Sequence, residues 1–479
     1  MGYALTAKRA AHAAARLLAA LAIVCAPLPA VAQDEASKPN VLVILTDDQG
    51  YADVGVYGSR HIETPHLDRL AREGVMLTQF YAGAPLCSPS RAALLTGRTP
   101  EWAGVNNNTG IVAGLDRSNR QLKLEQVTMA EVLMEHGYRT ALVGKWHLSG
   151  TPETTPNFQG FEFSFGHYNG VIDNYSHTAG RPYRHDLYLN GREIFRNGEY
   201  FPDLMVEEAI RFIDTQDERP FFLYFAMNAP HWPYQGDSDW VEEYRSRGLE
   251  FPHDEYAAFT SSLDERIGAL LTALRQRGLL DDTIVVFQSD HGHSTEPVAG
   301  NGGGSAGIYR SAKFPLFEGG IRVPAIIRWP KAAPGGAVRD QFAVSVDWLP
   351  TILDLAGIPA DGLELDGRSL RAVLGDPDAA TPHESYVWRW NDLVIVAADT
   401  WAVRRGDWKL LVNPVDTSFE YSRESTTLTD IFLVNLRDDP AETASVHADH
   451  PDIVAELLAI RDAYIADLQS AGKFEPPAQ

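Results

Sequence analysis

The sequence has 479 residues, of which 44% are hydrophobic and 22% charged, a composition that indicates a globular protein and excludes a disordered one. The formal net charge of −23 disfavours nucleic acid as a partner, and any site for a sulfated or phosphorylated polyanion must be a local basic cleft. The length suits one large domain with a smaller one beside it.

The first 32 residues have the pattern of a secretory signal peptide. A basic stretch precedes an apolar run over residues 17–24, and a small-residue cleavage site, Ala30-Val31-Ala32, follows. We therefore predict that the mature chain begins at Gln33 and is exported, either to the periplasm or out of the cell. The apolar run is short and interrupted by proline, so we expect no membrane anchor.

Helices and strands then alternate along the chain. Continuous apolar runs predict strands at residues 40–46, 75–81, 140–143, 220–227, 283–287 and 323–329. Helical spacing of apolar residues predicts helices near residues 64–71, 129–136, 206–213 and 259–274. This alternation predicts an α/β fold with a large mixed, mostly parallel sheet sandwiched by helices.

Two stretches depart from that alternation. Residues 148–200 show little periodicity, and we expect an insertion of short strands over the active face; residues 301–307 are rich in glycine. After residue 380, short strands follow one another without helices between them, and they are predicted at 385–390, 393–398, 401–404, 408–412 and 431–436. One helix, predicted at 452–470, follows these strands. We predict a catalytic α/β domain over 33–380 and a C-terminal α+β subdomain, an antiparallel sheet with one helix, over 381–479.

Four of the predicted strands end in polar, chemically capable side chains. These are Asp47 and Asp48, Lys145 and His147, His231, and Asp290 with His291. Each group alone is compatible with a turn or a surface histidine. In open parallel sheets, however, ligands bind outside the carboxyl ends of the strands, so their agreement predicts one common site.

The stretch Leu86-Cys87-Ser88-Pro89-Ser90-Arg91 has the pattern of a loop that enters a helix. A helix start binds anions, and the guanidinium of Arg91 would add a permanent charge there. Three residues separate Cys87 from Arg91, whereas the phosphate loop of cysteine phosphatases needs five. Cys25 leaves with the signal peptide, so Cys87 is the one cysteine of the exported chain; the plain alternative is a buried free thiol.

The residue types at these positions can bind a divalent cation, bind an oxyanion and move protons. Carboxylates of Asp47, Asp48 and Asp290 are ligands for a hard ion such as calcium, whereas His291 favours manganese or zinc. Fixed positive charge for a tetrahedral oxyanion comes from Arg91, Lys145 and Lys313. His147 and His231 can move protons near neutral pH.

The segment Cys87-Ser88-Pro89-Ser90-Arg91, followed by Thr96-Gly97-Arg98, resembles the signature of type I sulfatases, formylglycine-dependent members of the alkaline phosphatase superfamily. The resemblance runs from about Pro39 to Trp329 and is weaker beyond. It implies an alkaline phosphatase-like fold. It also implies that a formylglycine-generating enzyme oxidises Cys87 to formylglycine (3-oxoalanine), whose hydrate is the nucleophile.

The resemblance further implies a role for each residue of the predicted site. One Ca2+ ion would be bound by Asp47, Asp48, the residue derived from Cys87, Asp290 and His291. Arg91 and Lys145 would hold that residue and the sulfate, while His231 and Lys313 would contact the sulfate and protonate the leaving oxygen. His147 would remove a proton from the second hydroxyl of the hydrate. The family often has Asn where His291 stands, which leaves another divalent metal open.

The segments 228–233 and 173–177 look like those of sulfatases that act on sulfated sugars. We therefore predict a sulfatase acting on a sulfated saccharide or polysaccharide, with a sugar subsite lined by Trp232, Tyr175, His177 and Trp390, although each could instead be a core or rim residue. The alternatives are a phosphomonoester or phosphonate hydrolase of the same superfamily and an inactive sulfatase-like glycan binder. The sequence does not indicate an oligomeric state.

Overall fold

The computed structural model describes residues 38–109, 111–112, 115–116, 120–179, 183–215, 217–391, 399–417 and 429–474. The predicted signal peptide and the predicted strand 393–398 lie outside the described residues. Among the helices that are described, none has both the length and the hydrophobicity needed to cross a bilayer.

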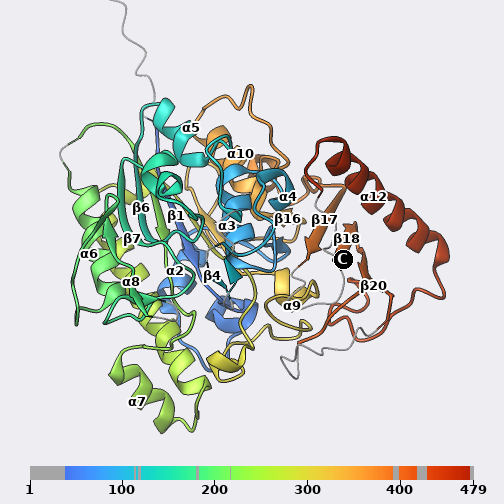
Figure 1. The fold of residues 1–479 in the computed structure, drawn as a ribbon, viewed down its shortest axis with the longest axis horizontal. Coiled ribbons are helices and arrows are strands. Elements are labelled where there is room, and N and C mark those ends of the chain that lie inside the picture. Colours follow the sequence, from blue (N-terminus) through green and yellow to red (C-terminus); the bar gives the residue numbers. More distant parts are fainter. Residues whose placement is uncertain are drawn as a thin grey trace, which may run out of the picture. The chain divides into compact units, whose positions relative to one another are not determined.

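A mixed sheet of ten strands forms the centre of the fold (Figure 1). In spatial order its strands are β11 (Arg192–Glu193), β10 (Tyr188–Leu189), β7 (Phe163–His167), β6 (Arg139–Lys145), β12 (Phe221–Ala226), β1 (Asn40–Thr46), β13 (Thr283–Ser289), β14 (Ala325–Arg328), β2 (Val75–Leu77) and β15 (Ala337–Arg339). This sheet confirms the predicted fold class.

The four central strands, β6, β12, β1 and β13, are parallel neighbours. Ile44 of β1 lies opposite Phe225 of β12 on one side and Phe287 of β13 on the other, and Phe225 lies opposite Val143 of β6. Because these residues share one row, all four strands reach their carboxyl ends at the same edge of the sheet. That edge carries the predicted site.

Helices cover both faces of this sheet. Val41, Val43 and Leu45 of β1 pack into one apolar core, and the alternate residues Leu42 and Ile44 pack into another. The first core receives α3 (Cys87–Thr96), α5 (Met129–Glu135) and α10 (Trp348–Leu355); the second receives α2 (Pro65–Glu73), α6 (Phe201–Ile213) and α8 (His253–Gln276). A strand buried on both faces needs apolar residues at every position, which explains the unbroken apolar runs.

Two predicted stretches differ from the structure. The single strand predicted at 75–81 is two strands, because the chain leaves the main sheet after Leu77 and β3 (Phe80–Tyr81) pairs with β16 (Ala343–Val344). Both halves are apolar, so periodicity alone does not reveal the change of partner. Within 148–200, β7, β10 and β11 extend the main sheet, and only β8 (Thr178–Ala179) and β9 (Arg184–His185) form a separate ribbon there.

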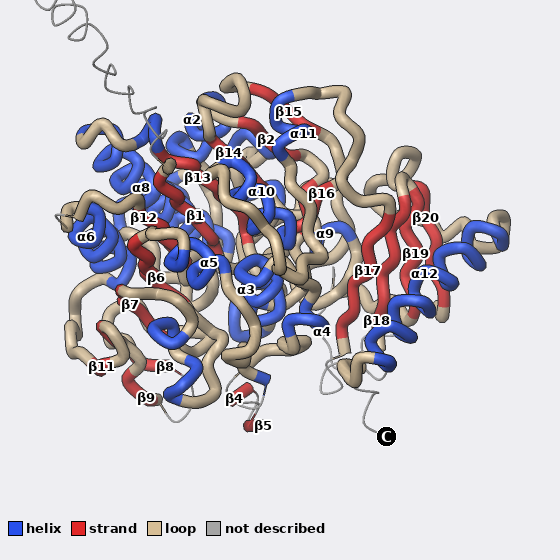
Figure 2. Tube along the Cα trace, turned by 90° about the horizontal axis from the view of Figure 1, so that it is seen from above, coloured by secondary structure: helices blue, strands red, loops and turns tan. Residues whose placement is uncertain are grey.

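The C-terminal region forms an antiparallel sheet of its own (Figure 2). Its strands are β17 (Ser385–Trp390), β18 (Thr400–Arg405), β19 (Trp408–Val412) and β20 (Ile431–Asn435). One face packs against the segment around Phe314 and Phe317, and α12 (Pro451–Ser470) covers the other. The remaining short elements are α4 (Pro100–Ala103), β4 (Ile111–Val112), β5 (Leu115–Asp116), α7 (Ser238–Ser246), α9 (Glu318–Ile321) and α11 (Arg371–Gly375).

Candidate active site

The loops that follow the four central strands bring the predicted polar residues together. The backbone amide of Asp47 donates to the carbonyl of Ala229 beyond β12, and the amide of Asp290 donates to the carbonyl of Thr46 at the end of β1. These cross-strand bonds lock neighbouring loops to one another. All of the polar side chains at this edge are buried: Asp47, Asp48, Lys145, His147, His231, Asp290, His291 and Lys313.

Helix α3 begins at Cys87 and points its first turn into the same place. The Cys87 sulfur lies 3.3 Å from Nε2 of His291, and Arg91, one turn later, places Nη2 3.1 Å from Oδ2 of Asp290. The hydroxyl of Ser88 donates to the carbonyl of His147 (2.7 Å), and that of Ser90 donates to the carbonyl of Asp290 (2.5 Å). The two serines between the predicted nucleophile and arginine therefore tie α3 to the loops after β6 and β13.

Two lysines neutralise the two adjacent aspartates. Lys145 Nζ lies 2.5 Å from Oδ2 of Asp47, and Lys313 Nζ lies 2.8 Å from Oδ1 of Asp48. Lys313 also lies 3.3 Å from Oε2 of Glu296, an acidic residue that the sequence analysis missed. Charged side chains from distant parts of the sequence are thus buried together at this edge of the sheet.

The carboxylates of the site differ in how easily they ionise. Burial raises the pKa of Asp48 to about 8, although Lys313 opposes this shift, and burial raises the pKa of Asp290 to about 6. Burial is the largest single influence on Asp47 and opposes its ionisation, but Lys145, His231, Arg91 and Lys313 together outweigh it and keep the pKa of Asp47 well below its usual value. The neighbouring positive charges therefore favour ionisation of Asp47, whereas at Asp48 and Asp290 burial still outweighs them.

The thiol of Cys87 and the imidazole of His291 form a charged pair. Burial opposes the thiolate, but Lys145 and Lys313 outweigh it and lower the pKa of Cys87 to about 6. Burial opposes the imidazolium as well, but Asp290 and Cys87 raise the pKa of His291 to about 9. A metal ion bound by His291 would displace this proton.

The other two histidines are neutral at pH 7. Burial lowers the pKa of His147 and of His231 well below the usual value. Nδ1 of His147 has no partner among the described residues, and Gly170 approaches its ring so closely that a Cβ there would lie 2.6 Å from Cε1. The His147 ring is therefore packed against Gly170 and unprotonated.

The donor atoms fit a divalent cation. One ligand atom from each of Asp47, Cys87, Asp290 and His291 lies within 4.8 Å of all the others, and the same holds for Asp47, Asp48, Cys87 and His231. Oδ1 of Asp47 is buried and has no hydrogen-bond partner in the described chain. A buried carboxylate oxygen without a donor is costly, and a cation at this point would satisfy it.

Comparison with known families assigns the chain. The profile of the sulfatase family matches residues 39–358. This chain belongs to the sulfatase family. It is a sulfuric ester hydrolase, as the signature at Cys87 predicted. A second profile, N-sulphoglucosamine sulphohydrolase, C-terminal, matches residues 307–460 and includes the C-terminal sheet of this sulfatase.

Individual relatives agree with this assignment. Arylsulfatase A of Homo sapiens is 36% identical over 372 residues, which cover 71% of this sulfatase and 68% of the relative. N-acetylgalactosamine-6-sulfatase of Canis lupus familiaris is 34% identical over 395 residues, or 77% and 72% of the two chains. The crystal structure of Ps i-CgsB in complex with k-i-k-neocarrahexaose superposes with a TM-score of 0.79 at 28% identity, covering 89% of this chain and 93% of that one.

Two further buried residues of this sulfatase, Asp53 and Tyr256, were missed by the sequence analysis and support Asp48 from behind. The Tyr256 hydroxyl lies 3.1 Å from the carbonyl oxygen of Asp48 and 2.6 Å from Oδ2 of Asp53, which also accepts from the amide of Gly50. Asp48 has φ of 61°, a left-handed conformation that non-glycine residues rarely adopt. These hydrogen bonds hold the backbone of Asp48 in this conformation.

The glycine-rich stretch explains why this support is so close. A Cβ on Gly303 would lie 2.3 Å from Cβ of Tyr256, and a Cβ on Gly304 would lie 2.7 Å from both Oδ2 of Asp53 and the Tyr256 hydroxyl. Only glycine lets this backbone pack directly on the pair. The run of glycines in the sequence indicates that the backbone there lies close to other groups. The groups it contacts, Asp53 and Tyr256, come from distant parts of the sequence.

The four predicted sugar-subsite residues occupy different depths. Trp232 is half-buried and stacks on His231, with ring centroids 5.7 Å apart, and Tyr175 is 42% exposed and stacks on Tyr200. His177 is 0% exposed, and Trp390 is 1% exposed and stacks on Phe314 beside Lys313. The first two present ring surface to solvent, whereas the last two lie beneath the surface.

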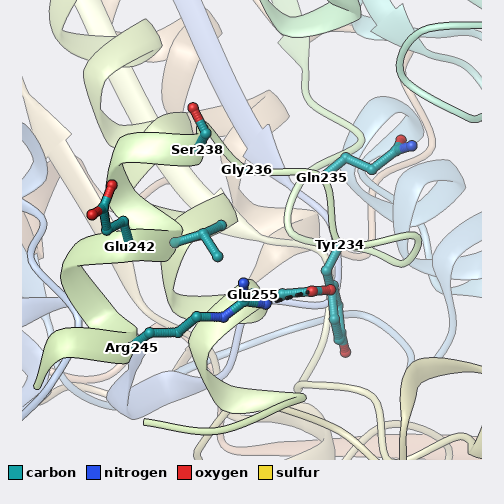
Figure 3. A pocket seen from close by; sticks show the side chains of 8 residues that line it. Tyr234, Gln235, Gly236, Ser238, Glu242, Arg245 and Glu255 are labelled. Atoms are coloured by element: carbon teal, nitrogen blue, oxygen red, sulfur yellow. Dashed lines mark hydrogen bonds and ion pairs between the residues drawn. The ribbon is translucent and has the colours of Figure 1, made fainter. Parts of the chain in front are cut away.

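An open hollow of about 540 Å³ lies beside α7, lined by the segment that follows His231 (Figure 3). Its lining residues include Tyr234, Glu242, Arg245 and Glu255. Arg245 points toward Glu255, 3.1 Å away, and also pairs with Asp254 at 2.7 Å. Because carboxylates balance this arginine, the hollow is poorly suited to a sulfate group.

Proposed function

We propose that this sulfatase releases sulfate from a sulfated mono-, oligo- or polysaccharide, with Cys87 in its formylglycine form as the nucleophile. The observation that carries the proposal is the position of Cys87 at the first residue of α3, with its sulfur 3.3 Å from Nε2 of His291 and its pKa lowered by the charges of Lys145 and Lys313. An exposed or structural cysteine would need no such surroundings. The relatives named above for N-acetylgalactosamine 6-sulfate and the structure with neocarrahexaose support a saccharide substrate.

The fit described above supports one divalent ion, for which we propose Ca2+. Its ligands would be Asp47, Asp48, residue 87, Asp290 and His291. When bound, the ion would polarise oxygen atoms held against it, and the hydrated aldehyde would supply the hydroxyl pair needed to attack sulfur and release sulfate. The nitrogen of His291 also suits manganese or zinc, so the ion is to be identified by elemental analysis of the purified protein.

Fixed charges position the anion in this proposal. Arg91 already donates to the carbonyl of Lys145 and to Asp290, so its guanidinium is rigid before any substrate arrives. Lys145 and Lys313 add two ammonium groups, and contact with Asp48 holds the pKa of Lys313 well above its usual value despite burial. Preorganised cations of this kind stabilise charge that develops on the leaving oxygen.

Proton transfer falls to the histidines and Lys313. His147, neutral and with Nδ1 free of a described partner, would accept the proton of the second hydroxyl. Nδ1 of His231 lies 2.7 Å from the carbonyl of Trp232, so the ring directs Nε2 toward Asp48, 3.7 Å away. An anionic substrate beside Nε2 favours its protonated form, from which His231, together with Lys313, would protonate the leaving oxygen.

Trp232 and Tyr175 are the residues we propose for contact with the sugar, because both expose ring surface and Trp232 stacks on His231. His177 and Trp390 would support that surface from below, Trp390 through Phe314. Turnover of 4-nitrophenyl sulfate together with no release from any sulfated glycan would contradict the saccharide assignment. A parallel assay with 4-nitrophenyl phosphate tests the phosphomonoesterase alternative, and calorimetric binding of a sulfated glycan without hydrolysis would indicate the inactive binder.

Replacement of Cys87 tests the nucleophile directly. Cys87→Ala is expected to lower sulfate release by about 10⁴-fold or more, because no other group in the site replaces the lost nucleophile. The matched control is the unaltered chain expressed without a formylglycine-generating enzyme, which keeps the fold and should be equally inactive. Mass spectrometry of the peptide that holds position 87 reports the modification. Undiminished release in either preparation contradicts the mechanism.

We also propose that the enzyme is exported and that residues 1–32 are removed. The basic, apolar and small-residue segments of residues 1–32 support this. N-terminal sequencing of the protein recovered from the periplasm and the medium should begin at Gln33. Recovery of the uncut chain from the cytoplasm alone contradicts it.

A further inference from the structure

We propose that Glu296 and Phe251 form a specificity subsite for the sugar that carries the sulfate, with Glu296 accepting a hydrogen bond from a ring hydroxyl and Phe251 stacking against the apolar face of a sugar ring. This inference rests on the proposed saccharide sulfatase activity and names residues that neither the predicted motif nor the strand-end pattern contained.

Glu296 lies at the mouth of the buried site. Its side chain is 22% exposed, and its Oε2 is 3.3 Å from Nζ of Lys313 and 3.0 Å from the hydroxyl of Ser294. The hydrogen bond that the Glu296 side chain accepts from the described residues goes to Oε2, not to Oε1. A carboxylate beside a sulfate-binding lysine opposes binding of an anion, and Lys313 is already paired with Asp48 at 2.8 Å. Glu296 is therefore not needed to neutralise Lys313, and its Oε1 is available to a donor on the substrate.

The backbone around Glu296 is held in place. Its amide donates to the hydroxyl of Ser294, and its carbonyl accepts from the amides of Ala299 (2.9 Å) and Asn301 (3.1 Å). The turn that this closes contains the 3-10 helix Pro297–Ala299. An acceptor fixed in this way loses little entropy when a hydroxyl binds, which is what discrimination between sugars requires.

Phe251 sits on the same turn. Gly300 approaches its ring so closely that a Cβ there would lie 2.7 Å from Cε1, and Phe251 remains 61% exposed. Because Gly300 is four residues after Glu296 in a closed turn, the exposed ring packs against the same turn that carries the carboxylate. A single exposed aromatic is common on protein surfaces. A turn that holds a carboxylate 3.3 Å from Lys313 and packs against an exposed ring offers partners for the two chemical faces of a sugar, its hydroxyls and its C–H surface.

The test compares an aryl sulfate with two sulfated sugars, which differ from it in carrying free hydroxyl groups. 4-nitrophenyl sulfate has none, whereas N-acetylgalactosamine 6-sulfate and galactose 6-sulfate carry several. Glu296→Gln should lower kcat/KM by about 10- to 100-fold for whichever sulfated sugar the unaltered enzyme cleaves faster, which corresponds to the loss of a hydrogen bond to a charged group. The fold-loss in kcat/KM for 4-nitrophenyl sulfate should be at least tenfold smaller. The matched control, Glu255→Gln in the hollow beside α7, should change neither.

The pattern of losses separates this role from the alternatives. An equal loss on both substrates would mean that Glu296 acts through Lys313 alone, and no loss on either would mean that it is idle; both results overturn the subsite. Glu296→Asp, which keeps the charge but shortens the reach, should also be selective against the sugar, and its melting temperature reports folding. If the unaltered enzyme cleaves 4-nitrophenyl sulfate but no sugar, it is the proposed saccharide activity that fails.

Phe251 is tested in the same way. Phe251→Ala should raise KM for the sulfated sugar about 3- to 10-fold, as loss of an aromatic contact does, with kcat little changed; Phe251→Trp should keep the low KM. The control is Phe195→Ala, since Phe195 is 69% exposed and stacks on His185. Equal KM values for the two alanine variants overturn the stacking role.

Discussion

Two buried clusters of charge differ in how completely their members are paired. One is the active cluster: Asp47, Asp48, Arg91, Lys145, Asp290, His291 and Lys313. The other joins α9 to the C-terminal sheet and is called here the C-terminal ion network: Tyr81, Glu318, Arg322, Arg404, Lys409 and Glu442. Both lie almost wholly out of solvent, and both combine acids with Lys and Arg.

In the C-terminal ion network the central carboxylate is fully satisfied. Glu318 pairs with Lys409 (2.9 Å) and Arg322 (3.2 Å), and it accepts a hydrogen bond from Tyr81 (2.6 Å). Burial alone would raise the pKa of Glu318, but Lys409 and Arg322 outweigh it and lower that pKa to about 2. In the active cluster the pKa of Asp48 instead rises to about 8. Glu442, which shares Lys409 with Glu318, has its pKa raised to about 7 by burial, so the contrast is between the two carboxylates Glu318 and Asp48. Complete pairing of a buried carboxylate stabilises a fold, whereas a buried carboxylate that is incompletely paired can bind a ligand.

The largest effect that tests this difference between the two clusters is expected when one acid of the active cluster is neutralised. Asp48→Asn should lower sulfate release by about 10³-fold or more, since it removes a proposed metal ligand. Without metal it should raise the free energy of unfolding by about 1–3 kcal/mol, because the buried charge is under-compensated. Activity assays and urea unfolding in EDTA measure the two effects.

The corresponding acid-to-amide substitution in the C-terminal ion network is the control for Asp48→Asn. Glu318→Gln should lower the free energy of unfolding, because the carboxylate it removes is fully paired. If both exchanges shift stability in the same direction, the distinction between the two clusters fails.

The next largest effect is expected from Lys409→Met. This change leaves Glu318 and Glu442 buried without their shared ammonium, each of which lies 2.9 Å from it, and should destabilise the chain by about 3–5 kcal/mol. Turnover of 4-nitrophenyl sulfate per folded molecule should be unchanged, because the network contains no proposed catalytic group. Lys331→Met, which breaks an exposed ion pair with Asp282, should leave stability unaltered. Loss of kcat with normal stability would contradict this division.

The smallest effect is a difference in pH dependence. The folded pKa of Asp48, about 8, lies above its ordinary value of 3.8, so its contribution to stability is complete below pH 3.8 and is lost as pH rises toward 8. The folded pKa of Glu318, about 2, lies below 4.5, so its contribution is present above pH 4.5 and lost toward pH 2. The stability difference between the unaltered chain and Asp48→Asn in EDTA should therefore grow from pH 4 to pH 8.

Calcium should oppose the loss of stability that ionisation of Asp48 causes as pH rises. Because it binds the ionised carboxylates, added Ca2+ should stabilise the unaltered chain by about 1–2 kcal/mol more at pH 8 than at pH 5, as measured by thermal unfolding. An equal gain at both pH values would contradict the assignment of Asp48 as a ligand.

Much of this site was predictable because strand ends carry strong sequence signals. An unbroken apolar run followed by Asp47 and Asp48 marks both a buried strand and the polar edge at which it ends, and the same holds for Asp290 and His291. Glu296 and Tyr256 carried no such signal. Both lie in segments whose local pattern is ordinary, and their importance comes from side chains far away in sequence, Lys313 and Asp48.

The sequence by itself determined the layered α/β fold, the helix that begins at Cys87 and the set of polar residues at the strand ends, because these depend on local periodicity and on the chemistry of neighbouring residues. Only the tertiary structure decided which charges are paired. It placed His177 and Trp390 beneath the surface, packed the glycine run onto Asp53 and Tyr256, and left Asp48 short of a cation while Glu318 was fully satisfied. Pairing depends on distances between residues hundreds of positions apart, and those distances are set when the strands take their order in the sheet.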